Sequence, residues 1–146
     1  MKRSLCIIIA VVICFSTIFS VSFAAGVTDR KYVDTPYGKV TAELFSNKYI
    51  LGGNTRGKFV VGETRCANRA PRLITNVEVY KYTTGKKLYN EDRDLRNVLY
   101  SRVEIETDRF YGAYNDTFYN TPITIYGSHE LRSQRAYGAY TSLIGV

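Results

Sequence analysis

Basic side chains gather in one short stretch of the chain, where they could bind an anionic partner. Five of them fall within 17 residues: Arg56, Lys58, Arg65, Arg69 and Arg72. The last three flank Pro71, which predicts a loop, and guanidinium groups on a loop can grip phosphate or carboxylate through two parallel hydrogen bonds. We expect this stretch to contact an anionic polymer of the cell envelope or lipid headgroups. No motif for specific nucleic-acid binding accompanies it.

Aromatic residues form a second candidate binding feature. The segment Tyr111-Gly112-Ala113-Tyr114 recurs later in the chain as Tyr137-Gly138-Ala139-Tyr140. If the two segments pair as strands, each tyrosine ring can cover the bare backbone of a facing glycine. The alternative is that the rings present flat apolar faces for stacking on a sugar. Both interpretations stay open, and the four tyrosines are the candidates for carbohydrate binding.

Residues for catalysis are few. His129 is the only histidine, which excludes a zinc site built from several histidines. Ser128 and Glu130 flank it, but neighbours in a strand point to opposite faces, so the three cannot converge as a triad. A hydrolase would need a dispersed site, such as His129 with Cys66 or a distant carboxylate. We therefore expect His129 to be structural and the protein not to be an enzyme.

The densest group of carboxylates lies between residues 90 and 97. Glu91, Asp92 and Asp94 alternate there with Arg93 and Arg96. The spacing and glycine of a calcium-binding loop are missing. We expect a solvated, self-neutralising connection with at most one helical turn. The sequence predicts neither a metal site nor a cofactor.

Strands rather than helices should position these residues. Apolar residues recur with a period of two instead of the helical spacing. The clearest case is the run from Leu73 to Val79, in which every second residue is apolar or Thr; similar alternation marks residues 39–44, 59–66 and 99–106. Residues 83–86, Thr-Thr-Gly-Lys, predict a hairpin turn. We expect one domain over residues 25–146, an all-β antiparallel sandwich or partly open barrel of about 7–9 short strands.

The first 24 residues read as a secretory signal peptide. Lys2 and Arg3 precede an uncharged apolar run over residues 5–15, and Ser22-Phe23-Ala24 places small residues where signal peptidase requires them. Cleavage after Ala24 would remove two of the three cysteines and leave Cys66 alone. An intramolecular disulfide is then impossible, and we expect Cys66 to be buried; a disulfide-linked dimer through it is the alternative.

Charge and composition favour binding over catalysis. Beyond the predicted leader, 18 basic residues face 13 acidic ones, and the excess lies in the first half of the mature chain. All 13 tyrosines lie beyond the predicted leader, spread over both halves of the mature chain, which fits half-buried strand surfaces. The prediction is a secreted or envelope-associated, non-enzymatic module that binds an anionic or carbohydrate surface component. A bacteriocin-like toxin or effector and a hydrolase with a dispersed site are the alternatives.

Overall fold

The structure is all-β, as the alternation predicts. The computed structural model describes residues 22–23, 26–50, 56–106 and 121–146. The strands are β1 (Ser22–Phe23), β2 (Val27–Thr35), β3 (Gly38–Ile50), β4 (Arg56–Lys81), β5 (Lys87–Glu106), β6 (Ile123–Arg132) and β7 (Ala136–Leu143). Apart from the two-residue β1, six antiparallel strands form a nearly closed barrel. In the described part of the chain, no helix is long and apolar enough to span a membrane.

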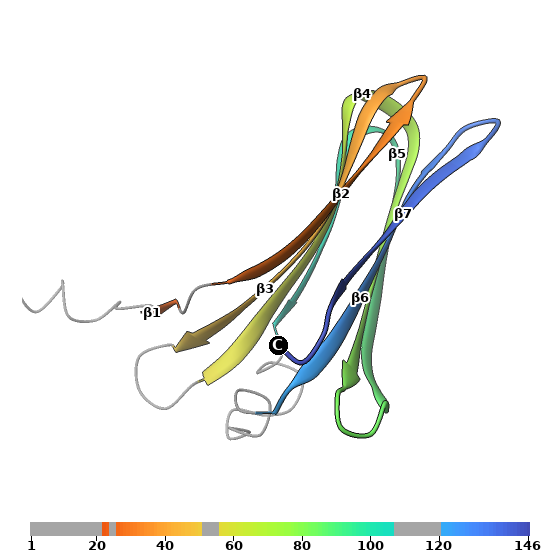
Figure 1. Ribbon diagram of the computed structural model, residues 1–146. Helices are drawn as coiled ribbons and strands as arrows, with labels where there is room; N and C mark the ends of the chain where they lie inside the picture. Colours follow the sequence, from red (N-terminus) through yellow and green to blue (C-terminus); the bar gives the residue numbers. More distant parts are fainter. Residues whose placement is uncertain (1–21, 24–25, 51–55, 107–120) are drawn as a thin grey trace, which may run out of the picture.

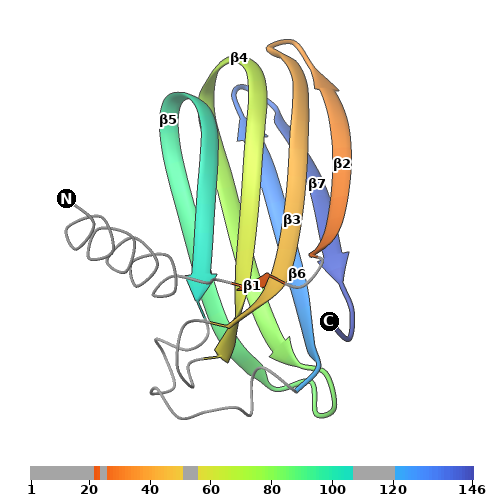
Figure 2. The same cartoon turned by 90° about the vertical axis from the view of Figure 1, so that its left-hand side faces the viewer.

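Two long bent strands make one continuous sheet into two layers (Figure 1). Residues 56–66 of β4 pair with β3, whereas residues 73–81 pair with β6. β5 follows β4 along both halves. The first sheet is therefore β2, β3, residues 56–66 of β4 and residues 100–106 of β5. The second sheet is residues 87–96 of β5, residues 72–81 of β4, β6 and β7. Figure 2 shows β4 and β5 arching over one end of the molecule from one sheet to the other.

The arch corrects two expectations from the sequence. Residues 69–71, expected as a loop, and residues 90–97, expected as a polar connection, both lie within strands. The pairing of β4 with β5 shifts register between Arg65 and Ala70, and Asn97 has a φ of 53°. Pro71 lies in this irregular stretch, where the missing N–H of a proline does not interrupt a regular ladder. Bulges bend the strands here instead of ending them.

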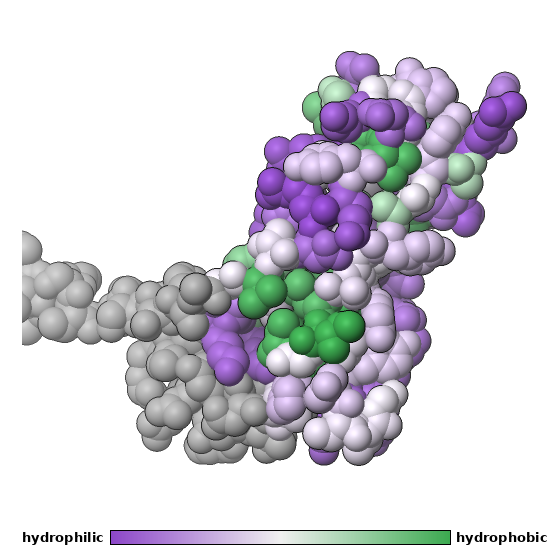
Figure 3. Space-filling model, in the orientation of Figure 1, coloured by the Kyte–Doolittle hydropathy of each residue, from purple (hydrophilic) through white to green (hydrophobic). Residues whose placement is uncertain are grey.

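The barrel closes incompletely along a seam between β2 and β7. No strand register joins the two along the described residues, but the Asp29 carboxylate Oδ2 accepts a hydrogen bond from the backbone N–H of Ser142 at 2.9 Å. A side chain thus supplies the contact that a strand partner would make. In the view of Figure 3, hydrophilic residues cover the middle of the molecule and hydrophobic residues gather below them, toward the C-terminus.

Two apolar clusters separated by polar side chains fill the space between the sheets. The larger cluster contains nine buried residues, among them Val60, Val77 and Ile105. The smaller one contains Leu73 and Leu131 beside Val40, Cys66 and Ala70. The predicted inward face of residues 73, 75, 77 and 79 is confirmed, since all four are buried. Between the clusters lie the buried polar residues Thr64, Thr75, Ser101, His129 and Thr141.

Candidate functional site

A hollow of about 540 Å³ lies on the outer face of the first sheet, and we call it the outer hollow. Four strands contribute to it, because side chains of alternate residues point to this face while their neighbours fill the core. Its lining residues are Arg30, Tyr32, Thr41, Glu43, Phe45, Phe59, Val61, Glu63, Arg65 and Arg102. The volume falls in the range of small-molecule sites. The outer hollow is therefore our candidate binding site.

A row of four charged residues crosses the middle of the outer hollow. Arg30 on β2 lies opposite Glu43 on β3, which lies opposite Glu63 on β4, which lies opposite Arg102 on β5. We call this row the charged rung. Two carboxylates directly opposite each other repel, and the arginine at each end of the rung offsets that repulsion.

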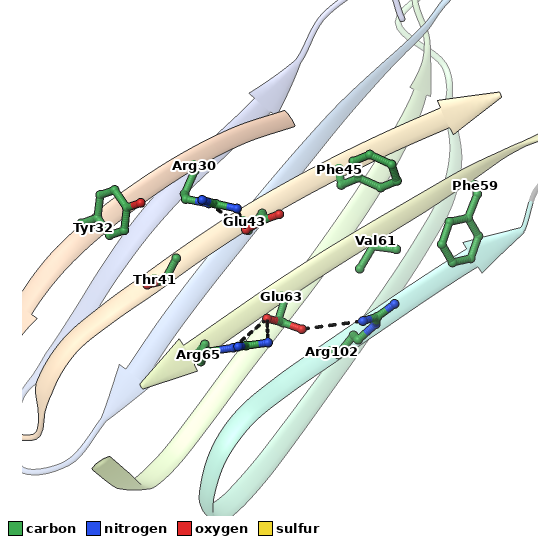
Figure 4. A pocket seen from close by; sticks show the side chains of 10 residues that line it. All are labelled: Arg30, Tyr32, Thr41, Glu43, Phe45, Phe59, Val61, Glu63, Arg65 and Arg102. Atoms are coloured by element: carbon green, nitrogen blue, oxygen red, sulfur yellow. Dashed lines mark hydrogen bonds and ion pairs between the residues drawn. The ribbon is translucent and has the colours of Figure 1, made fainter. Parts of the chain in front are cut away.

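Ion pairs hold the side chains of the charged rung in place. Arg30 contacts the Glu43 carboxylate through Nε at 2.8 Å and through Nη2 at 2.6 Å, and hydrogen bonding to Glu43 raises the pKa of Arg30. Glu63 accepts from Arg65 at 2.8 Å and faces Arg102 at 3.8 Å. Figure 4 shows two such groups, the Arg30 guanidinium against the Glu43 carboxylate and the Glu63 carboxylate between Arg65 and Arg102. Donors and acceptors are thus arrayed side by side.

The two ends of the outer hollow differ in character. Phe45, Phe59 and Val61 line one end, and Tyr32 lies toward the other (Figure 4). Tyr32 is 58% exposed, and the Lys39 ammonium lies 5.7 Å from its ring centre. Tyr100, the register partner of Arg65, is also exposed. The charged rung is therefore bounded by apolar and aromatic surface on which a ring can rest.

The predicted basic cluster does not form one surface. Arg65 lines the outer hollow. Arg72 lies on the second sheet, where both its Nε, at 2.8 Å, and its Nη2 donate to the Asp94 carboxylate. Arg69 lies at the arch and donates to the carbonyl of Asn97 at 2.9 Å. The bend in β4 separates these arginines, although few residues lie between them in the sequence.

Of the two remaining basic candidates, only Lys58 has a side chain among the described residues. The side chain of Arg56 lies outside the described residues, although its backbone begins β4. Lys58 is 1% exposed and points into the interior, where its Nζ donates at 2.6 Å to the main-chain oxygens of both Thr121 and Val146. Burial, with a smaller contribution from Lys48, lowers the pKa of Lys58 to about 8. Lys58 therefore links the start of β4 to the main chain at Thr121 and Val146.

Of the four tyrosine candidates, two can be placed. Tyr111 and Tyr114 lie outside the described residues, and so does any pairing of the repeated segments. Tyr137 is half-buried and packs against the smaller apolar cluster, beside its register partner Leu131. Tyr140, three residues further along β7, points outward from the second sheet and is 81% exposed. The second copy of the repeated segment thus places one tyrosine against the core and one on the surface.

His129 and Cys66 both lie in the interior. His129 Nδ1 lies 2.9 Å from Thr64 Oγ1, and Nε2 lies 2.9 Å from Thr141 Oγ1. The Thr64 hydroxyl lies 2.6 Å from that of Thr75, which donates to the carbonyl of Ser101 at 3.0 Å. Burial lowers the pKa of His129 to about 4. Cys66 is buried, as the sequence predicts.

Sequence reasoning did not single out the charged rung. The alternation around Val40 to Leu44 did place Thr41 and Glu43 on a wet face, but pairing in the folded sheet is needed to bring Arg30, Glu63 and Arg102 beside them. Among the described residues, no group of three or more His, Cys, Asp or Glu could hold a metal ion. Comparison with known protein families, curated proteins and solved structures finds no match for this chain.

Proposed function

We propose that the protein is an exported carbohydrate-binding module and that the outer hollow is its binding site. The observation that carries this proposal is the charged rung, which crosses a 540 Å³ hollow beside aromatic side chains. A sugar hydroxyl can donate one hydrogen bond and accept another, so adjacent guanidinium and carboxylate groups can bind two hydroxyl groups on neighbouring carbons of a sugar ring. The apolar face of a sugar ring can rest on a tyrosine or phenylalanine ring.

The ion pairs favour a sugar over a strongly anionic polymer. Arg30 and Arg65 are each already paired with a carboxylate of the hollow, and Arg102 lies between Glu63 and Glu104, with its Nε 2.5 Å from Glu104. The arginines and carboxylates that line the hollow nearly cancel in charge. A polyanion would have to displace these carboxylates, whereas a hydroxyl group can use both partners. Of the two ligand classes that the sequence predicted, anionic and carbohydrate, we therefore propose carbohydrate.

Retention of the purified protein on insoluble polysaccharides tests the proposal. Peptidoglycan, chitin and cellulose are suitable particles. Tyr32→Ala and Arg65→Ala should each weaken binding to the retaining polysaccharide by about tenfold or more, because a lost contact of about 1.4 kcal/mol is a factor of ten. Salt should change the wild-type affinity little, because few ions are displaced when neutral hydroxyl groups bind.

Two variants elsewhere on the molecule serve as matched controls. Tyr82, in the turn between β4 and β5, is exposed to nearly the same extent as Tyr32, at 54%. Arg72 belongs to the same basic stretch as Arg65 but lies on the other sheet. Tyr82→Ala and Arg72→Ala should bind like wild type. Equal losses for Arg65→Ala and Arg72→Ala, with binding that vanishes in salt, would instead show recognition of a polyanion. Release of reducing sugar ends would show a hydrolase.

A further inference from the structure

The outer face of the second sheet carries another row of polar side chains, separate from the outer hollow. Asp92 on β5 lies opposite Asn76 on β4, which lies opposite Ser128 on β6, which lies opposite Tyr140 on β7. Two hollows, of about 170 and 350 Å³, adjoin this row, and Ser128 and Tyr140 line both. We call these hollows together the Tyr140 site.

Asn76 gives the Tyr140 site an unused acceptor. Its side-chain oxygen Oδ1 is buried and has no hydrogen-bond partner among the described residues, although Asn76 lines the smaller hollow. A buried acceptor without a donor costs about 1–3 kcal/mol, so the fold retains an amide there at a cost in stability. If the Asn76 amide turns toward the hollow, a ligand hydroxyl or N–H group can reach this oxygen and remove that cost.

Small neighbouring residues on β7 leave one side of the Tyr140 ring uncovered. Gly138 and Ala136 precede it on the same face of β7, and the larger hollow lies over them. A Cβ added to Gly138 would meet only the backbone oxygen of His129, at 3.3 Å. The Tyr140 ring therefore has open space beside it on the outer face. Tyr126, 47% exposed, lines the smaller hollow below.

Two carboxylates beside the Tyr140 site are already held by neighbouring side chains. The Glu78 carboxylate already accepts from Lys87 Nζ at 2.5 Å and from the Tyr80 hydroxyl at 2.8 Å, and these bonds lower its pKa. Glu130 is held by Arg132 at 2.5 Å. Besides the exposed Asp92 carboxylate at the end of the row, the site offers a neutral acceptor, a serine hydroxyl and an exposed aromatic face. That combination fits the hydroxyl groups and the apolar face of a sugar ring.

We propose that the Tyr140 site is a second carbohydrate-binding site, so that one molecule can hold two polysaccharide chains on opposite faces. The choice of sugar as ligand rests on the proposed function of the outer hollow; the second site itself is argued from separate residues. Because the sites lie on the outer faces of different sheets, one chain bound at each would be cross-linked through the barrel.

Agglutination of polysaccharide particles tests for two sites. Wild-type protein should clump cellulose or chitin microparticles, while Tyr140→Ala and Asn76→Ala should still bind single particles through the outer hollow but need about tenfold more protein to clump them. Tyr82→Ala and Asn90→Ala, an exposed asparagine on the same sheet, are the matched controls. Sedimentation of the free protein as a monomer ensures that clumping does not come from self-association.

Two measurements separate binding from folding and one site from the other. Asn76→Ala should leave the free energy of unfolding unchanged or raise it, since an unsatisfied acceptor is lost; a structural role predicts a loss of stability. Titrating ¹⁵N-labelled protein with a chitin or cellulose hexasaccharide should shift the amide signals of Ser128 and Tyr140 independently of those of Glu63 and Arg65.

The outcomes distinguish the two proposals. If wild type is retained on no polysaccharide and no hexasaccharide shifts any amide, both the outer hollow and the Tyr140 site fail. If Tyr32→Ala lowers retention while Tyr140→Ala agglutinates like wild type and the Ser128 amide stays unshifted, only the second site fails. If Tyr140→Ala alone lowers retention and the Glu63 and Arg65 amides do not move, only the outer hollow fails.

Discussion

Acidification should destabilise the fold through His129. The Thr75 hydroxyl donates to the carbonyl of Ser101, so it can accept from Thr64. Thr64 can then accept from a protonated Nδ1 of His129, which leaves Nε2 to accept from Thr141. This assignment gives the imidazole ring, Thr64 and Thr75 one donated and one accepted hydrogen bond each with a neutral imidazole. Protonating Nε2 would force the Thr141 hydroxyl to turn from donor to acceptor and would place a positive charge in a buried site.

The size of the effect follows from the pKa of His129. Burial lowers the pKa from 6.5 to about 4 in the folded protein, while the nearby Asp29 carboxylate acts weakly in the opposite direction. Between pH 6.5 and pH 4 the unfolded chain therefore takes up a proton that the folded protein does not. Each pKa unit is worth 1.36 kcal/mol, so stability should fall by about 3 kcal/mol across this window and no further below it.

Urea unfolding at pH 4, 5, 6 and 7, followed by circular dichroism because tryptophan is absent, measures the effect. Carboxylates titrate in the same range, so the informative quantity is the difference from His129→Gln, whose amide keeps a donor and an acceptor but does not titrate. The variant should lose about 3 kcal/mol less than wild type between pH 7 and pH 4. Parallel stability curves for the two proteins would refute the argument.

The interior allows two further predictions. Lys58 has a pKa of about 8 in the folded protein against 10.5 in the unfolded chain, so between these pH values only the unfolded chain holds the proton. As the pH rises from 8 to 10.5, the free energy of unfolding of wild type should therefore increase by about 3 kcal/mol relative to that of Lys58→Met. Parallel stability curves for the two proteins in urea titrations would contradict this. Gly62→Ala should cost about 1–3 kcal/mol in thermal or urea unfolding, because its Cβ would collide with Val77 Cγ2. Gly85→Ala, where no neighbour lies within 4 Å but φ is +67°, separates crowding from backbone strain.

Alternation predicts which face of a strand is buried but not where a strand bends. It correctly places Leu73, Thr75, Val77 and Val79 in the core, since a regular strand turns every second side chain inward. It fails at Leu99, expected inside with Ser101 but 45% exposed. The positive φ of Asn97 breaks the period just before it. Such a bulge leaves no trace in the pattern of apolar residues.

The candidate sites depend on pairing between strands, which the sequence of one strand does not contain. Glu43 and Glu63 meet because β3 and β4 pair in one register, and a shift of one residue would turn every side chain to the other face. The same limit explains the split of the basic stretch. Arg65 and Arg72 are close in sequence, but the arch in β4 carries them to different sheets.

The interior and the outer hollow meet in three consecutive residues. Thr64 points inward to His129, while Glu63 and Arg65 on either side of it point outward into the hollow. A hydrogen bond across the core thus fixes the backbone that carries the centre of the charged rung. Binding groups on a strand whose inward neighbour is anchored hold their geometry better than groups on a loop. His129 therefore supports the surface that we propose binds sugar, which gives a reason for a chain of polar side chains in a core that apolar residues could otherwise fill.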